Sequence, residues 1–286
     1  MTAGAARIRP AVAADVPAID RILRANDDAD PAAALPPGAQ DAYLAHLIAR
    51  GTTVVAEGDA EVVGFAATVS NGRATHLADL FVLPSHHGRG IGRDLLAAVF
   101  ADAWPRTTFA SHDPAAMPLY IRSGMTPLWP SLYLRGDPRR LPDAPAELSV
   151  ELASFADLAR LEREWAAVDR MPEVAYWRTL PGAEPFVVAR GGRPVAICLG
   201  RDRLNRIGRW IDRALVAPDV EPVGPLTTAI RRTAGGDLVG ACVPGPSPLV
   251  PVLLEAGFRI AEWDVFLASE PDLVDPIRQL VNPGLL

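Results

Sequence analysis

The sequence predicts an α/β protein with a mixed sheet and helices on both faces, and it predicts that this fold occurs twice. Apolar, strand-like runs alternate with amphipathic helical stretches in both halves, the order typical of such a sheet. Short segments also recur, because Val54 and Val187 begin the same Val-Val-Ala run and Gly124 and Gly257 occupy matching turns, each pair 133 residues apart. With 286 residues, the chain is long enough for two domains of ordinary size.

The first half predicts one complete series of strands and helices. Apolar residues recur at helical spacing from Val16 to Leu23, and Gly58-Asp59 is a turn signal between two apolar runs. A strand before a glycine-rich loop and an amphipathic helix after it complete the centre of the series. We expect helices over 15–25, 39–50, directly after the loop, and 114–123, and strands over 6–10, 52–57, 61–70, 75–83 and 106–110, with closing strands to about 135.

A Pro-rich linker at 137–147 separates the two halves and gives domains at 1–136 and 148–286. Beyond the linker, Ser154 and Asp157 have the spacing of a capping box at the start of a helix. The run from Asp212 to Pro218 parallels Asp79 to Pro84 with one residue inserted. The second domain is therefore predicted to repeat the fold of the first.

The segment that follows Leu80 predicts a phosphate-binding loop. An apolar strand ends at Pro84, glycines follow at Gly88, Gly90 and Gly92, and an amphipathic helix then begins. Glycines let backbone N–H groups converge on one point, and a helix N-terminus adds partial positive charge. The spacing differs from the Gly-x-Gly-x-x-Gly dinucleotide fingerprint, and the chain has no lysine for a Walker loop.

Three segments resemble the GCN5-related N-acetyltransferase (GNAT) family, in the family's order. His87-Gly-Arg-Gly-Ile-Gly92 resembles the cofactor-loop motif Arg/Gln-x-x-Gly-x-Gly/Ala, with His in the first position. The segment from Asp113 to Met125 resembles the second motif, Asn-x-x-Ala-x-x-x-Tyr-x-Lys/Arg-x-Gly-Phe, with Asp and Met as the departures. Residues 7–19 resemble the first strand and helix. The resemblance covers residues 5 to about 135, and the tandem arrangement is similar in architecture to mycothiol synthase.

The resemblance implies transfer of an acetyl or other acyl group from acetyl-CoA to the amine of a small-molecule acceptor, by direct attack in a ternary complex. It implies that Tyr120 protonates the departing thiolate, although a Tyr on an amphipathic helix also fits core packing. The expected donors that polarise the thioester carbonyl are the backbone N–H groups around Phe81, Val82 and Leu83. The expected cofactor contacts are those three residues with His87, Gly88, Arg89, Gly90, Ile91, Gly92, Arg93, Asp113 and Tyr120.

The catalytic base has three candidates. His76 lies where some family members carry a glutamate base, and imidazole has a suitable pKa, but the residue equally fits a structural position on a strand. Asp79 lies where polyamine-acetylating members keep acidic groups, so it could act as the base or orient the amine. A water molecule is the third candidate. A loop with Asp27, Asp28 and Asp30 could attract a cationic acceptor, or could simply be solvated.

The second half lacks the residues that carry this chemistry. In place of the glycine loop it has Glu221-Pro-Val-Gly-Pro, in which prolines remove backbone donors and Glu221 repels phosphate. Leu253 stands at the position of Tyr120, and Pro246 at that of Asp113. We therefore expect a degenerate second domain with a structural or substrate-shaping role, and one active site.

Composition limits the remaining function classes. A net charge of −6 and a pI near 5.4 argue against a nucleic-acid partner. No stretch approaches ~20 apolar residues and no signal peptide is recognisable, so we expect a cytoplasmic protein without a membrane partner. Cys198 and Cys242 give neither a disulfide framework nor metal-ligand spacing. The tandem predicts a monomer that mimics a dimer, or a homodimer, and the alternative to an enzyme is a non-catalytic acyl-CoA-binding or regulatory module.

Overall fold

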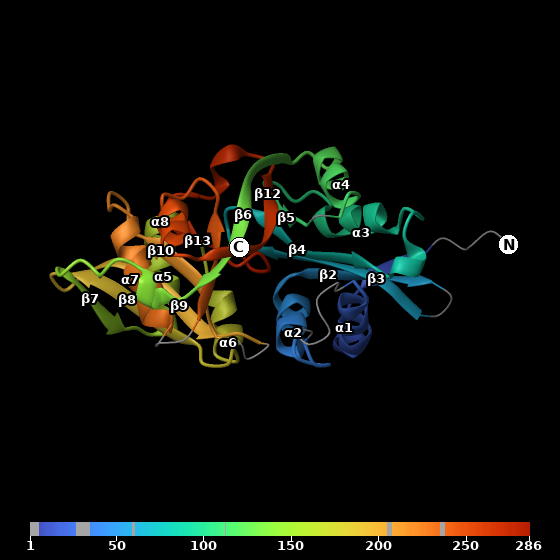
Figure 1. The fold of residues 1–286 in the computed structure, drawn as a ribbon. Coiled ribbons are helices and arrows are strands. Elements are labelled where there is room, and N and C mark those ends of the chain that lie inside the picture. The colour runs from blue at the N-terminus through green and yellow to red at the C-terminus, as the bar shows by residue number, and fades with distance from the viewer. Residues whose placement is uncertain (1–5, 27–34, 59–60, 112, 205–207, 235–237) are drawn as a thin grey trace. The chain divides into compact units, whose positions relative to one another are not determined.

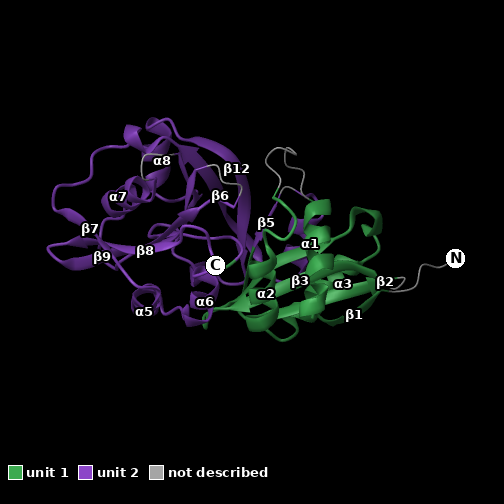
Figure 2. Cartoon of the chain, turned by 90° about the horizontal axis from the view of Figure 1, so that it is seen from below, with its two compact units in different colours: residues 1–108, 285 green, residues 109–284, 286 purple. Residues whose placement is uncertain are grey.

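The computed structural model describes residues 6–26, 35–58, 61–111, 113–204, 208–234 and 238–286. The chain divides into two compact units (Figure 2). Unit 1 comprises residues 1–108 and 285, and unit 2 comprises residues 109–284 and 286. No helix among the described residues is long and apolar enough to cross a membrane.

Unit 1 has a five-stranded sheet in the order β1-β2-β3-β4-β5. All neighbouring strands are antiparallel except β4 and β5, which are parallel. Helices α1 and α2 cover one face and α3 covers the other (Figure 1). The elements are β1 (Arg7–Pro10), α1 (Val16–Ala25), α2 (Asp41–Arg50), β2 (Thr52–Gly58), β3 (Glu61–Ser70), β4 (Thr75–Val82), α3 (Ile91–Phe100) and β5 (Arg106–Ala110), with short 3₁₀ turns at Ala13–Asp15 and Pro84–His86.

Strand β4 carries a bulge that separates two parts of the strand. Leu77 lies opposite Thr68 of β3 and Asp79 lies opposite Ala67, so Ala78 has no opposite residue. β4 pairs with β5 only from Thr75 to Leu77, before the bulge. Beyond the bulge, no described strand other than β3 pairs with β4, and its second edge is open.

Unit 2 repeats this architecture around a sheet in the order β12-β6-β11-β10-β9-β8-β7, with β13 beside β10. β10 and β11 are parallel, as β4 and β5 are, and the other pairs are antiparallel. The elements are α4 (Ala116–Arg122), β6 (Thr126–Gly136), β7 (Leu148–Leu152), α5 (Phe155–Ala166), α6 (Val174–Trp177), β8 (Glu184–Arg190), β9 (Arg193–Asp202), β10 (Arg209–Val216), α7 (Val223–Ala234), β11 (Val239–Pro244), α8 (Leu249–Glu255), β12 (Arg259–Ala268) and β13 (Gln279–Leu280), with 3₁₀ turns at Pro138–Arg140, Met171–Glu173 and Pro271–Leu273.

The predicted α/β fold in two copies is confirmed, and so is the capping box of the second copy. The hydroxyl of Ser154 accepts from the Asp157 amide, and the Asp157 carboxylate accepts from the Ser154 amide. The predicted closing strands near 135 are wrong in number, since they are the single strand β6.

The packing boundary differs from the predicted domain boundary. Residues 109–136 pack in unit 2, because β6 pairs with both β11 and β12. Sequence periodicity could not reveal this pairing, since it joins residues more than 100 positions apart. The boundaries 1–136 and 148–286 describe repeated sequence rather than packing, and they stay a prediction.

Candidate active site

The glycine loop of unit 1 has the backbone geometry that its glycines predict. Gly88 has φ +75° and Gly90 has φ +82°, both in the left-handed region that side chains rarely adopt. Gly90 caps the N-terminus of α3, whose first internal bond runs from the Asp94 amide to the Gly90 carbonyl at 3.1 Å. The amides of α3 that come before Asp94 have no acceptor within the helix. This end of α3 can therefore bind an anionic group.

Each basic side chain of the loop bonds to a different group of the protein, so these side chains form no common cluster. The Nε2 atom of His87 donates to the Val82 carbonyl at 2.8 Å, and the side-chain Nδ2 of Asn26 donates to the same oxygen at 3.1 Å. Arg89 donates to the Ser85 carbonyl at 3.0 Å, and Arg93 pairs with Asp94 at 3.0 Å. The His87 ring therefore ties the loop to the end of β4, and the anion-binding capacity lies in the backbone.

The open edge of β4 selects among the predicted amide donors. The Leu83 amide donates to the Val63 carbonyl at 2.8 Å, so it is already used within the sheet. Since hydrogen-bonding direction alternates along a strand, the Phe81 amide faces β3 and those of Leu80 and Val82 face the open edge. Of the predicted donors, Val82 therefore has an amide directed to the open edge, as Leu80 also does, whereas the amides of Phe81 and Leu83 face β3. The role of these amides at a thioester carbonyl stays a prediction.

Asp79 lies directly after the bulge and is held by a residue of another element. The hydroxyl of Tyr43 on α2 donates to its Oδ2 atom at 2.8 Å. Burial raises the pKa of Asp79 to about 6, and the hydrogen bond from Tyr43 counteracts part of that rise. A half-buried carboxylate with such a pKa can accept a proton near neutral pH.

The second predicted base, His76, lies before the bulge, where β4 is paired on both sides. Its side chain is only 1% exposed, and Nδ1 lies 3.0 Å from the Thr107 hydroxyl. This enclosure favours the structural interpretation over the catalytic one.

Three further groups of predicted residues stay predictions. Tyr120 and Asp113 belong to unit 2, where Tyr120 is 6% exposed and the Asp113 carboxylate accepts from the Ala115 amide at 2.8 Å before α4. Asp27, Asp28 and Asp30 lie outside the described residues. Tyr43 is not predicted from the sequence, because it belongs to no motif and contacts Asp79 only through the fold.

In unit 2, the position of the Asp79 carboxylate is taken by a guanidinium. β10 has a bulge at Asp212, with Ile211 opposite Gly200 and Arg213 opposite Leu199. Matching the two bulges pairs Asp79 with Arg213, so the sequence match with Asp212 is one residue out of register. Arg213 donates to Glu162 through Nε at 2.6 Å and Nη2 at 2.8 Å, in a buried ion pair.

The edge of β10 that corresponds to the open edge of β4 is also filled. β13 pairs with it at Ala214 and Leu215, and the Val216 amide donates to the Arg278 carbonyl at 3.0 Å. At the start of α7, Glu221 accepts from the amides of Val223 at 2.9 Å and Gly224 at 3.4 Å. Unit 2 therefore satisfies, within itself, backbone groups at this edge and at the start of α7, which agrees with the predicted degenerate second copy.

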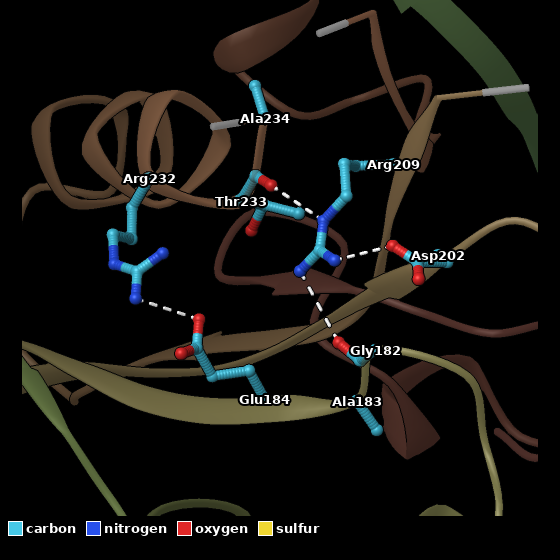
Figure 3. Close-up of a pocket in the computed structure, with 8 residues that line it drawn as sticks. All are labelled: Gly182, Ala183, Glu184, Asp202, Arg209, Arg232, Thr233 and Ala234. Atoms are coloured by element: carbon cyan, nitrogen blue, oxygen red, sulfur yellow. Dashed lines mark hydrogen bonds and ion pairs between the residues drawn. The ribbon is translucent and has the colours of Figure 1, made fainter. Parts of the chain in front are cut away.

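One hollow in unit 2 is lined by charged side chains that are already paired (Figure 3). Arg209 donates to the Thr233 carbonyl at 3.0 Å and the Gly182 carbonyl at 3.3 Å, and it pairs with Asp202. Arg232 pairs with Glu184 at 2.8 Å. These contacts join β8, β9, β10 and α7, and each of the four charged side chains that line the hollow has an ion-pair partner, which favours a structural interpretation of the hollow.

The glycine loop can be tested with Gly90→Ala, with Gly72→Ala as its matched control. An added Cβ meets no atom within 4 Å at Gly72 (φ +84°) and only the flexible end of the Arg93 side chain, at 3.2 Å, at Gly90, so both variants should lose about 1–2 kcal/mol of unfolding free energy, mainly through backbone strain. Only Gly90→Ala is expected to weaken acetyl-CoA binding, measured by calorimetry, because only Gly90 orients the start of α3. Equal affinities in the two variants would contradict a cofactor role for this loop.

Comparison with known proteins agrees with this geometry. Residues 49–124 match the family model described as acetyltransferase (GNAT) domain. No curated protein matches the sequence.

Solved structures match over nearly the whole chain. A protein of Pyrococcus horikoshii described as a candidate acetyltransferase is 13% identical, with 99% of this chain and 96% of that chain covered and a TM-score of 0.72. A tandem GNAT protein from the clavulanic acid biosynthesis pathway is 16% identical, with coverage of 94% and 100% and a TM-score of 0.62. A GCN5-related N-acetyltransferase from Sphaerobacter thermophilus is 14% identical, with 98% of each chain covered and a TM-score of 0.58.

At these identities the solved structures establish the fold, and the family model establishes the type of domain. The mycothiol synthase comparison stays a prediction. Residues 49–124 thus match a GNAT acetyltransferase domain, and the whole chain has a fold similar to that of a solved tandem GNAT protein.

Proposed function

We propose that this chain transfers an acetyl group from acetyl-CoA to the amine of a small molecule, by direct attack at one active site on β4 and the glycine loop. The observation that carries the proposal is Asp79, a carboxylate with a pKa of about 6 that is half-buried beside the open edge of β4. A group of this kind can deprotonate an amine near neutral pH.

The residues of unit 1 suit the cofactor in two ways. The left-handed glycines and the start of α3 offer backbone N–H groups to a pyrophosphate. The open edge of β4 offers the extended backbone against which a pantetheine chain could lie. When bound, acetyl-CoA supplies the acyl group and a thiolate leaving group.

The protein's own residues then have separate tasks. Asp79 accepts the proton that the acceptor amine loses. The amides of Leu80 and Val82 donate to the carbonyl oxygen, where negative charge develops during attack. Tyr120 protonates the departing thiolate, and this assignment is supported by its sequence motif alone. Since His76 is enclosed, it is left out of the mechanism.

The proposal is tested by thiol release from acetyl-CoA with a panel that contains an alkylamine, a polyamine, an amino sugar and an amino acid. We expect amine-dependent release, and calorimetry should give one acetyl-CoA per chain, because unit 2 has filled the corresponding edge. Binding without release for every class of amine would favour the non-catalytic module. Two bound cofactors per chain would contradict a single active site.

A further inference from the structure

Tyr43 and Asp79 are joined by a contact that belongs to neither sequence motif. Tyr43 lies on α2, a helix that packs on β2 and β3, and its neighbours Leu44 and Leu47 are buried in the core. Its hydroxyl donates to the Asp79 Oδ2 atom at 2.8 Å, across 36 residues of sequence. Among the described residues, Tyr43 is the one recorded hydrogen-bond donor to this carboxylate.

We propose that Tyr43 is a positioning residue for catalysis: its hydroxyl fixes the Asp79 carboxylate through Oδ2, so that Oδ1 is the oxygen that accepts the proton from the acceptor amine. The inference rests on the proposed role of Asp79 as the base. It adds a residue from a helix on which no predicted site residue lies.

A hydrogen bond from Tyr43 affects the Asp79 carboxylate in two ways. A carboxylate that is bonded through one oxygen loses rotational freedom about χ2, so its other oxygen has a defined direction. A donor to the charged form also lowers the pKa of an acid, which opposes the rise caused by burial. The pKa of Asp79 has these two causes, and among the described groups of α2, β3 and β5 no charged side chain contributes.

A purely structural tyrosine would behave differently. Its aromatic ring would fill space beside β4, and a phenylalanine ring would fill the same space. Removal of the hydroxyl would then leave the titration of Asp79 unchanged. The hydroxyl itself is therefore the group to remove, and Tyr43→Phe removes nothing else.

The first measurement needs no acceptor. Carboxyl-carbon NMR of protein labelled with ¹³C-aspartate identifies Asp79 as the signal that Asp79→Asn lacks. We expect a transition near pH 6 in the parent protein, and one about one pH unit higher in Tyr43→Phe, because the charged carboxylate loses a hydrogen-bond donor that water replaces only in part. An unshifted transition would overturn the inference.

The second measurement is the pH dependence of kcat, with the best amine of the panel. The acidic limb is the part of the pH profile in which kcat falls as Asp79 becomes protonated. In Tyr43→Phe this limb should move to higher pH by the same amount as the NMR transition, and kcat at high pH should stay within about tenfold of the parent value. If Tyr43→Phe lowers kcat equally at every pH and leaves the acidic limb of the pH profile where it is in the parent, the role of Tyr43 is structural and the inference is contradicted. If Tyr43→Phe unfolds, Tyr43→Met repeats the titration with a flexible apolar side chain that has no hydrogen-bond donor.

The repeat supplies a matched control. Tyr176 on α6 stands 133 residues after Tyr43 in the second copy. Tyr176→Phe should leave both the Asp79 titration and kcat unchanged, and a shift there would contradict the specific role of Tyr43. If Asp79→Asn keeps the parent kcat and the acidic limb of its pH profile, Asp79 is not the base, and the part of the proposed function on which this inference rests fails. If Asp79→Asn loses kcat while Tyr43→Phe shifts nothing, only the Tyr43 inference fails.

Discussion

Asp79→Asn is expected to lower kcat by about 10²- to 10⁴-fold, the usual contribution of a positioned general base. Asn has nearly the same shape and still accepts a hydrogen bond from Tyr43, but it cannot take a proton. Because the pKa of Asp79 is about 6, kcat of the parent enzyme should fall as the pH drops below 6, and this limb should be absent in the variant. The measurement is kcat from pH 5 to 9 at saturating acetyl-CoA.

The stability of the same variant separates a catalytic loss from a structural one. Burial raises the pKa of Asp79 above its usual value of 3.8, so between these pH values the folded protein binds more protons than the unfolded chain. Stability therefore falls as the pH rises through this window, and ionised Asp79 opposes folding at neutral pH. The melting temperature of Asp79→Asn at pH 7.5 should equal or exceed that of the parent.

The control for lost charge is Glu61→Gln. Glu61 lies on β3 in the same unit, and its carboxylate is 52% exposed and 3.4 Å from Arg21. Removing it should leave kcat and its pH dependence within about twofold, since an exposed ion pair contributes ~1 kcal/mol or less. If Asp79→Asn retains the parent kcat and acidic limb, a water molecule rather than Asp79 is the base.

The sequence predicted the glycine loop better than it predicted the base. A glycine is informative when the backbone needs a positive φ, and Gly88 and Gly90 both do. The place of the proposed base, Asp79, depends on a bulge, which has no sequence signature, and on a contact between α2 and β4 that only folding creates. His76 and Asp79 were therefore indistinguishable by sequence, whereas the bulge places one between paired strands and the other at an open edge.

The same bulge explains the register error in the second copy. A bulge at Ala78 and another at Asp212 shift the two strands equally, but four residues separate β3 from β4 and six separate β9 from β10. A match of identical residues therefore paired Asp79 with Asp212, although the backbone pairs it with Arg213. The position that carries an acid in unit 1 carries a cation, Arg213, in unit 2, and this cation is paired with the Glu162 carboxylate. Substitutions at this ion pair are therefore expected to change stability rather than catalysis.

Glu162→Gln is accordingly expected to destabilise unit 2 by about 3–5 kcal/mol, the usual effect of breaking a buried ion pair from one side. Glu162 is 2% exposed and bonds Arg213, and its Oε2 atom also accepts from Arg170 at 3.1 Å. Without the charge of Glu162, two buried guanidinium groups lose their shared partner. Denaturant unfolding of the whole chain measures the loss.

Asp169→Asn is the matched control, because the Asp169–Arg163 pair lies in the same region of sequence with 48% of the Asp169 side chain exposed. It should change the unfolding free energy by about 1 kcal/mol or less. Glu162→Gln should also leave the affinity of the glycine loop for acetyl-CoA unchanged at temperatures where the chain is folded, because that loop belongs to unit 1. If Glu162→Gln loses no more stability than Asp169→Asn, the Glu162–Arg213 ion pair does not stabilise unit 2. The residue at the position of the proposed base would then have no structural role in the second copy.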